Sequence, residues 1–315
     1  MISPPTGRLA PSPTGHLHLG HARSFLLAWW HVRSRNGRMH LRIEDLDSER
    51  SKPELVDTCL RDLEWLGLDW DGPVLLQSSD TSALERAAGD LLARGLAYPC
   101  VCTRAEIADM SAPHAGDRET PYPGTCRGRW RTLAEAERAT GRRAGLRALI
   151  AQGTVTIDDL VCGQRSFDVA AEVGDILIRR RDGIWAYQLA VVVDDDRQGV
   201  NEVLRGDDLL PSAARQWHLS RLCGREPPRW AHVPLVVHPS GERLSKRRAD
   251  LALAHLRESG VDPRGVVAWA SRSAGQTRAE RCTAAEVLGD FDLQRLPRRA
   301  ETLDESFAQR LMQMR

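Results

Sequence analysis

The sequence contains no run of apolar residues that approaches the roughly 20 needed by a helix that crosses a bilayer. Hydrophobic residues make up 42% and charged residues 28% of its 315 residues, a composition typical of globular domains in water. The opening residues, MISPPTGRLAPSPTG, also lack the basic segment and apolar core of a secretory signal. We therefore expect a cytoplasmic protein without a membrane partner.

Neither sign of charge dominates the chain. Lys and Arg (44) nearly balance Asp and Glu (43), which gives a formal net charge of +1, so bulk charge does not predict a polyanionic partner. Any contact with a nucleic acid would come from local groups such as Arg127, Arg129 and Arg131. For any one group, an exposed arginine-rich face without a binding role is the commoner explanation.

The arrangement of apolar residues predicts an α/β fold. A short strand at 8–10 leads through a turn containing Gly15 into a helix whose apolar residues recur from Ala22 to Trp29. Alternating apolar residues from Met39 to Ile43 then indicate a second strand. Further helices are expected at 54–66 and 82–94, and further strands at 185–193, 203–205 and 233–237.

The change of texture after residue 97 predicts an insertion. Cysteine, proline and glycine crowd the region from Pro99 to Gly128, which indicates a module with little regular structure in its first part. The predicted division is a first half of a nucleotide-binding domain (1–97), an inserted module (98–181), the second half (182–250) and a short helical appendage (251–315).

The segment from Pro11 to His21 has the features of a phosphate site. His18 and His21 bracket Leu-Gly at the predicted start of a helix, where backbone N–H groups and the positive helix end attract anions. Gly20 permits close approach, and the two imidazoles suit phosphate oxygens that gain charge during a transfer reaction. A metal-binding pair and ordinary surface histidines remain the alternatives.

A second candidate lies late in the chain, after the predicted strand at 233–237. Here Arg243-Leu244-Ser245-Lys246-Arg247 forms a basic loop. Lys246 has the charge to neutralise nucleotide phosphates, and Ser245 adds a hydrogen-bond donor. Taken alone, this sequence is more often an ordinary basic loop.

Together the two segments resemble the signatures of class I aminoacyl-tRNA synthetases. His18-Leu19-Gly20-His21 is similar to their HIGH signature, and 243–247 is similar to KMSKS. The resemblance implies a Rossmann-like parallel sheet and catalysis by His18, His21 and Lys246. It assigns ATP binding to these residues and to Gly20, Arg243 and Ser245. Position 243 carries Arg where the family has Lys, and the two side chains differ in geometry.

The residues before the first signature resemble the glutamyl branch of that family. The resemblance implies glutamate contacts from Arg8, Leu9, Ala10, Pro11, Ser12, Glu44, Tyr187 and Arg205. Arg8 suits a substrate carboxylate and Glu44 an α-ammonium group, while Tyr187 and Arg205 are expected on later strands. For Glu44 and Arg205 separately, a structural ion pair is the commoner role. Mg²⁺ is expected with ATP.

Seven cysteines without a secretory signal favour thiol or metal chemistry over disulfides. Cys100, Cys102 and Cys126 gather with Tyr122 in the inserted module, and zinc is the natural candidate. The short glutamyl-Q branch of the family has this Cys-x-Cys, Tyr-x-x-x-Cys pattern, which implies that all four residues are ligands. His114 is the rival fourth ligand, and three free thiols without metal are the other alternative.

Only the segment from 249 to 315 follows the second signature, which is short for the anticodon-binding region of a full glutamyl-tRNA synthetase. The resemblance to the glutamyl-Q branch therefore implies that L-glutamate is activated with ATP and transferred to the queuosine base of tRNA(Asp). Three alternatives remain. They are a truncated synthetase that charges a tRNA 3′ end, an inert synthetase-like binding protein, and a nucleotidyltransferase of another kind.

Overall fold

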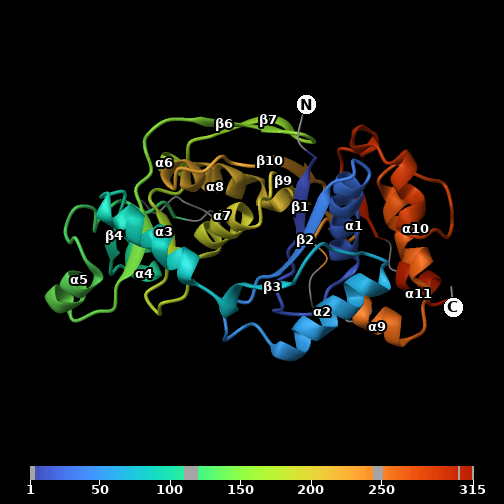
Figure 1. Ribbon diagram of the computed structural model, residues 1–315, viewed down its shortest axis with the longest axis horizontal. Coiled ribbons are helices and arrows are strands. Elements are labelled where there is room, and N and C mark those ends of the chain that lie inside the picture. Colours follow the sequence, from blue (N-terminus) through green and yellow to red (C-terminus); the bar gives the residue numbers. More distant parts are fainter. Residues whose placement is uncertain (1–3, 110–119, 243, 245–250, 304–305, 314–315) are drawn as a thin grey trace.

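The computed structural model describes residues 4–109, 120–242, 244, 251–303 and 306–313. Parallel strands lie at the centre of the molecule, an antiparallel region lies at one end, and the C-terminal helices lie at the other (Figure 1). Among the described residues, no helix is long and apolar enough to cross a membrane. The arrangement confirms the predicted α/β class.

The first part of the chain forms the strand–helix–strand unit that the sequence predicts. Strands β1, β2 and β3 pair in parallel in that order. Helix α1 connects the first two, and its Leu26, Leu27 and Trp30 are fully buried. The elements of this part are β1 (Thr6–Leu9), α1 (Leu19–Arg33), β2 (Arg38–Ile43), α2 (Pro53–Trp65), β3 (Leu75–Leu76) and α3 (Ser82–Ala93).

Strands far apart in sequence complete the central region. Strands β9 and β10 pair in parallel, and β9 lies beside β1 because Asn201 N donates to Thr6 O at 3.0 Å and Thr6 N to Asn201 Oδ1 at 2.8 Å. The carboxyl ends of these strands therefore open on a common edge. The elements are α7 (Tyr187–Arg197), β9 (Glu202–Gly206), α8 (Leu210–Leu222), β10 (Arg229–Val233) and β11 (Val236–Val237).

The strand predicted at 185–193 is wrong, because residues 187–193 begin helix α7. Leu189 to Val193 are all buried, and a short apolar run that is buried on every side looks the same in a helix and in a central strand. Packing of α7 against α3 and α8 overrides the strand preference of its three consecutive valines. Tyr187 consequently lies at the first position of a helix instead of on a strand.

The single strand predicted at 233–237 is also wrong. Strand β10 ends at Val233 and β11 begins at Val236, with Pro234 between them. Because proline has no N–H to donate to a neighbouring strand, the pairing with β9 ends at this point. Strand β11 then pairs in parallel with a strand from the C-terminal segment.

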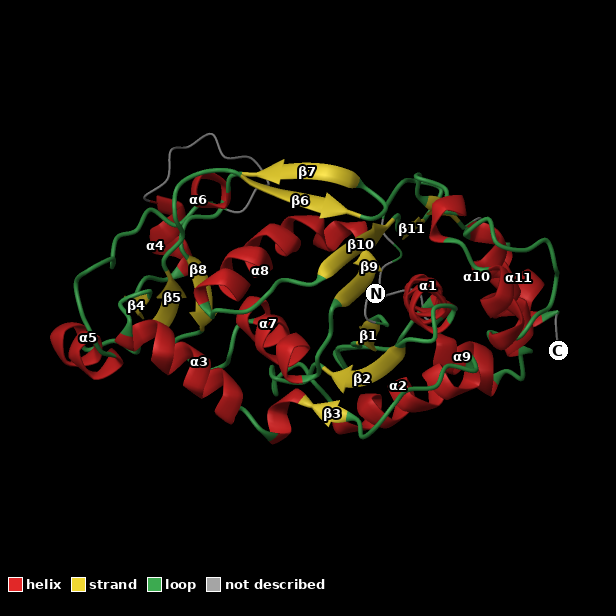
Figure 2. Cartoon of the chain, turned by 45° about the horizontal axis from the view of Figure 1, so that its top comes forward, coloured by secondary structure: helices red, strands yellow, loops and turns green. Residues whose placement is uncertain are grey.

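The segment between the two central parts forms small antiparallel sheets. Strands β4, β5 and β8 make one sheet, and β6 and β7 form a hairpin that runs along α8 (Figure 2). Leu160 N of the hairpin donates to Trp230 O of β10 at 2.9 Å. The elements are β4 (Ala97–Cys100), α4 (Arg104–Asp109), α5 (Leu133–Thr140), β5 (Gly145–Ala148), β6 (Val155–Asp159), β7 (Gly163–Phe167), α6 (Val169–Glu172) and β8 (Ile176–Arg179).

The C-terminal segment is mainly helical, as predicted, but it is part of the core and not an appendage. Val266, Val267 and Trp269 are buried together with α1. The buried Arg23 of α1 donates to Ser273 Oγ and to Pro234 O, each at 2.7 Å. The elements are α9 (Leu253–Glu258), α10 (Pro263–Ser273), β12 (Glu301–Thr302) and α11 (Phe307–Met312).

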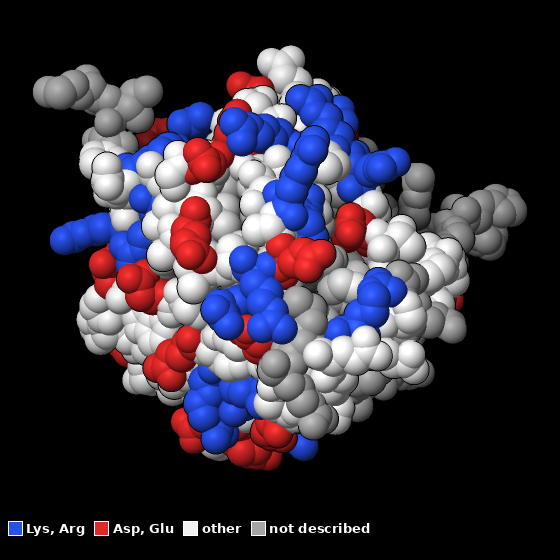
Figure 3. Space-filling view, turned by 90° about the vertical axis from the view of Figure 1, so that its right-hand side faces the viewer, with Lys and Arg blue, Asp and Glu red and all other residues white. Residues whose placement is uncertain are grey.

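The face at this end of the molecule carries charges of both signs. Figure 3 shows basic and acidic side chains side by side, without a large field of either sign. The C-terminal segment also contains ion pairs: Asp262 lies 2.8 Å from Arg264 and 3.3 Å from Arg281. The described part of this face therefore lacks the one-sided positive potential that favours a polyanion.

Candidate functional site

A cavity of about 490 Å³ opens where β1, β2 and β9 end. Its location follows the rule that ligands of open parallel sheets bind beyond the carboxyl ends of the strands. Most predicted site residues among the described ones line it: Arg8, Ala10, Pro11, Ser12, His18, Gly20, His21, Glu44, Tyr187 and Arg205. Leu9 does not, since its side chain is fully buried in the core.

The two histidines cap the N-terminus of α1. His18 Nδ1 accepts from Gly20 N at 3.1 Å, and His21 Nδ1 accepts from His18 N at 3.2 Å. Because both Nδ1 atoms accept, a neutral ring carries its proton on Nε2. A Cβ on Gly20 would lie 3.0 Å from the His18 ring, so glycine leaves room for the cap. No acidic residue occupies the first turn, and the positive helix end is left to attract an anion.

The second signature falls largely outside the described residues, which include neither Arg243, Ser245 nor Lys246. Leu244 is described, is buried, and lines the cavity. Further along, Leu253 N donates to Leu17 O at 2.8 Å, and Ala252 forms a β-bridge with His18. The residues that flank the second signature therefore lie against the first one.

Arg205 is held from three sides at the end of β9. Its Nε donates to His232 Nε2 at 3.0 Å, Nη1 to Tyr187 Oη at 3.4 Å, and Nη2 to Leu209 O at 3.3 Å. These contacts use three of the five guanidinium N–H groups. Tyr187, on the first turn of α7, is 37% exposed and also lines the cavity.

Glu44 follows β2 directly and has a nearly buried side chain. Burial raises its pKa, although the nearby Arg42 and Arg8 oppose the change. A carboxylate that is shielded from water at a cavity wall gains from a bound cation. The position therefore suits an ammonium group.

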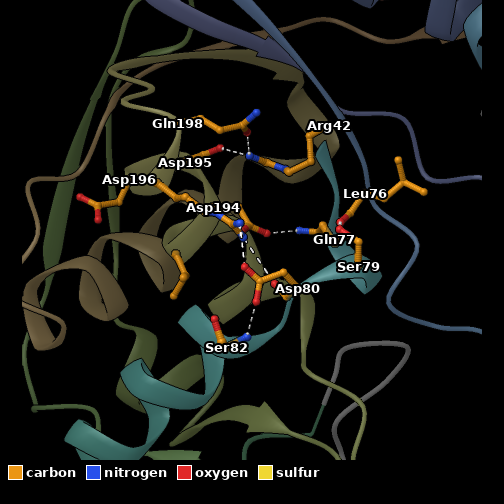
Figure 4. Close-up of polar contacts among 12 residues, drawn as sticks. Arg42, Leu76, Gln77, Ser79, Asp80, Ser82, Asp194, Asp195, Asp196 and Gln198 are labelled. Carbon is orange, nitrogen blue, oxygen red and sulfur yellow. Dashed lines mark hydrogen bonds and ion pairs between the residues drawn. The ribbon is translucent and has the colours of Figure 1, made fainter. Parts of the chain in front are cut away.

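Two charged residues that sequence reasoning missed lie behind this wall: Arg42 and Asp195. Arg42 Nη1 donates to Asp195 Oδ1 at 2.8 Å and to Gln198 Oε1 at 2.9 Å (Figure 4). Its Nη2 donates to Glu44 Oε1 at 3.2 Å, and Arg8 Nε lies 3.5 Å from Asp195 Oδ1. Asp195 thus joins the guanidinium groups of β1 and β2.

Arg42 was hidden by the alternating pattern of β2, which predicts an exposed side chain at that position. Instead, Arg42 is fully buried. The available signal was the run Asp194-Asp195-Asp196 directly after an apolar stretch, because adjacent buried carboxylates require cationic or amide partners. Asp194 meets this requirement by accepting from Gln77 Nε2 at 2.8 Å (Figure 4).

Cys100, Cys102 and Cys126 form a compact cluster in which the three sulfur atoms lie within 4.8 Å of one another. The Tyr122 hydroxyl is part of it, at 3.4 Å from Cys100 Sγ and 3.9 Å from Cys102 Sγ. Burial and the neighbouring thiols raise the pKa of Cys102 to about 12. The rival ligand His114 lies outside the described residues.

Tyr122 is fixed by one contact at its hydroxyl and another over its ring. Its hydroxyl accepts from Cys126 N at 2.8 Å, and the Arg147 guanidinium lies 3.8 Å from the ring centroid. Arg147 in turn donates to Asp175 O at 2.7 Å. The tyrosine oxygen is therefore held among the sulfur atoms by the surrounding protein.

Known proteins resemble the chain over most of its length. The chain is 44% identical to a glutamyl-Q tRNA(Asp) synthetase of Symbiobacterium thermophilum, over 93% of this chain and 94% of that protein. It is 39% identical to a glutamate–tRNA ligase of Azorhizobium caulinodans, over 94% of this chain and 63% of that protein.

The fold is similar to that of a solved glutamate tRNA ligase from Elizabethkingia meningosepticum in complex with its amino acid. The TM-score is 0.83 at 24% identity, over 98% of this chain and 69% of that one. Residues 6–308 also match the model for the catalytic domain of tRNA synthetases class I (E and Q), a family whose substrates are ATP, an amino acid and tRNA. The chain belongs to the class I tRNA synthetases of this E and Q family.

Proposed function

We propose that the chain activates L-glutamate with ATP and transfers the glutamyl group to the queuosine base of tRNA(Asp). The observation that carries the amino-acid choice is the charge of the cavity wall. Two buried arginines, Arg8 and Arg205, line the cavity together with the nearly buried Glu44, and the ion pair of Arg42 and Asp195 lies behind them. Two guanidinium groups and one carboxylate at the strand ends complement the two carboxylates and one ammonium group of glutamate.

In this proposal the strand ends position the substrate. Arg8 and Arg205 hold carboxylate oxygens, Tyr187 adds a hydroxyl, and Glu44 receives the α-ammonium group. Fixing these groups aligns the α-carboxylate oxygen for attack on the α-phosphate of ATP, and the bond to pyrophosphate breaks. Glutamyl-adenylate and pyrophosphate result, and a hydroxyl of the modified nucleoside then attacks the glutamyl carbonyl, forms an ester and releases AMP.

The ATP half of the cavity lies at the start of α1. The Nε2–H groups of His18 and His21 stabilise charge that develops on the phosphate oxygens, with backbone N–H groups at Gly20 and the helix end. The proposal assigns a further positive charge to Lys246, with Arg243 and Ser245 beside it. Bound Mg²⁺ would offset the triphosphate charge.

The acceptor is supported by the relatives. The glutamyl-Q tRNA(Asp) synthetase of S. thermophilum is matched over 94% of its length, and one of Nocardia farcinica is 45% identical over 91% of its length. Transfer to a tRNA 3′ end is the second candidate, because a glutamate–tRNA ligase is 39% identical. The assembled cavity does not favour the alternative of an inert synthetase-like binding protein.

Labelled glutamate separates the two acceptors. With ATP, we expect label on tRNA(Asp) that contains queuosine and none on tRNA(Asp) without it or on tRNA(Glu). Nuclease digestion should place the label on the modified nucleoside. Label on the terminal adenosine would reject the queuosine acceptor and leave glutamate activation intact.

We also propose that Cys100, Cys102, Tyr122 and Cys126 bind Zn²⁺. Tetrahedral zinc with Zn–S bonds of about 2.3 Å has S···S edges of about 3.8 Å and S···O edges of about 3.5 Å. The observed 3.5 Å between Cys102 and Cys126 Sγ and 3.4 Å between Cys100 Sγ and Tyr122 Oη are close to these values. Zinc would cross-link β4 to the loop before α5 and favour the thiolates.

Zinc content tests the ligand set. We expect about one zinc per chain in the wild type and a large loss in Cys126→Ser, whereas Cys223→Ser, outside the cluster, should retain it. Tyr122→Phe should bind zinc more weakly than the wild type, whereas His114→Ala should bind zinc as tightly as the wild type. Full zinc affinity in Tyr122→Phe together with a loss in His114→Ala would show that His114, and not Tyr122, is the fourth ligand. A metal-free wild type from zinc-supplemented cells would reject the site.

A further inference from the structure

His232 lies in direct contact with Arg205 but does not line the cavity. The two residues are register partners on the parallel strands β10 and β9, and Arg205 Nε donates to His232 Nε2 at 3.0 Å. The His232 side chain is fully buried. Its contact fixes the Nε side of the guanidinium plane and so sets the direction of the N–H groups that face the cavity.

The protonation of this pair follows from its geometry. Arg205 Nε always carries a hydrogen, so His232 Nε2 must present a lone pair. The ring proton of a neutral His232 therefore lies on Nδ1, which is 2.6 Å from Asp159 Oδ2. Burial lowers the pKa of His232, and Arg205 adds to that effect, whereas Asp159 opposes it.

Asp159 is the fixed end of this series of hydrogen bonds. It ends β6, its side chain is fully buried, and Oδ1 accepts from Val161 N at 3.0 Å and Cys162 N at 2.8 Å. His232 N also donates to both carboxylate oxygens at 3.1 Å. These bonds lower the pKa of Asp159 even though burial opposes them, so an ionised acceptor faces His232.

We propose that Asp159 and His232 are positioning residues for Arg205. Through these two residues, the β6–β7 hairpin orients the Arg205 guanidinium. Asp159 selects the Nδ1–H form of His232, and His232 then offers Arg205 an acceptor. This inference rests on the proposed role of Arg205 in holding glutamate. It makes the hairpin, which belongs to the segment between the two central parts of the chain, a determinant of amino-acid binding.

An amide at position 159 reverses the hydrogen bonds. The Asn oxygen would stay with the backbone donors of Val161 and Cys162, and its NH₂ would then face His232 Nδ1. That nitrogen would have to accept, the proton would move to Nε2, and an N–H would point at the N–H of Arg205. Two donors in contact repel, and Arg205 would turn away from its present orientation.

Pyrophosphate exchange provides the first test. We expect Asp159→Asn to raise the KM for glutamate by about tenfold or more while the KM for ATP changes by less than about twofold. Asp158→Asn is the matched control, because Asp158 is the exposed neighbour on β6, and it should behave as wild type. Equal changes in both KM values, or none, in a folded Asp159→Asn protein would reject the positioning role.

Substitution of His232 gives a second pair. His232→Gln retains an acceptor for Arg205 and should restore much of the glutamate affinity that His232→Phe loses. Thermal unfolding of each variant measures the structural cost separately. If His232→Gln and His232→Phe have the same glutamate KM at similar stability, the acceptor does not position Arg205.

The ¹⁵N shifts of the His232 ring test the inference without any activity. We expect protonated Nδ1 and bare Nε2 in the wild type and the reverse in Asp159→Asn, with the resonance assigned by its absence in His232→Gln. The reverse assignment in the wild type would overturn the inference even if glutamate is the substrate. Wild-type protein with the expected shifts but without glutamate-dependent exchange would instead reject the proposed function.

Discussion

Replacing Arg8 with leucine is expected to reduce glutamate-dependent pyrophosphate exchange more than any other single change in the cavity wall. The side chain is buried at the end of β1 and lies 3.5 Å from Asp195. The substitution removes a cation for the substrate carboxylate and leaves Asp195 with less compensation. Breaking a buried charge pair costs about 3–5 kcal/mol, which corresponds to a loss of about 10²–10⁴-fold in kcat/KM for glutamate.

The effect of Arg8→Leu should be confined to the kinetics with glutamate. We expect the KM for ATP to change by less than about threefold, because the phosphate groups lie at the start of α1. Arg38→Leu provides the control, since Arg38 is exposed at the start of β2, and it should retain full activity. An Arg8→Leu enzyme with normal glutamate kinetics would show that the carboxylate is bound elsewhere.

Removing the charge of Asp195 should have the second largest effect. Without it, the guanidinium groups of Arg8 and Arg42 repel each other across the cavity wall. Arg42, already 3.2 Å from Glu44, would draw that carboxylate away from the substrate ammonium. We expect Asp195→Asn to lower kcat/KM for glutamate by about 10–100-fold, with a raised glutamate KM and a lower melting temperature.

Asp194→Asn is the matched control for this experiment. Asp194 is equally buried on the same helix but faces Gln77 (Figure 4), and an amide oxygen still accepts from Gln77 Nε2. Its variant should keep the wild-type KM for glutamate at a modest cost in stability. If the two variants have the same glutamate kinetics, Asp195 acts only on stability.

Most of the predicted glutamate contacts line one cavity, and three of them lie near strand ends. Arg8, Glu44 and Arg205 each lie within one residue of the last residue of β1, β2 or β9, and parallel strands bring such positions to one edge whatever their separation along the chain. The two histidines could be placed for a similar reason, since a helix start is a local feature. Their capping bonds also span only three residues.

The missed residues depend on contacts that local patterns do not contain. Arg42 looks exposed in an alternating strand until Asp195, 153 residues away, is placed beside it. His232 is one polar residue in an apolar strand, and its role requires Asp159 from a hairpin 73 residues earlier. Helix α7 was mistaken for a strand because burial on all sides removes the period that distinguishes the two.

Amino-acid dependence of pyrophosphate exchange in the wild-type protein tests the central claim most directly. We predict ATP–pyrophosphate exchange that requires L-glutamate and is at least about 100-fold weaker in kcat/KM with L-glutamine or L-aspartate, measured both with and without queuosine-containing tRNA(Asp). Glutamine has no side-chain carboxylate to pair with a second arginine, and aspartate is one methylene shorter. Exchange that is equally supported by glutamine, or independent of any amino acid in both arms, would contradict the account.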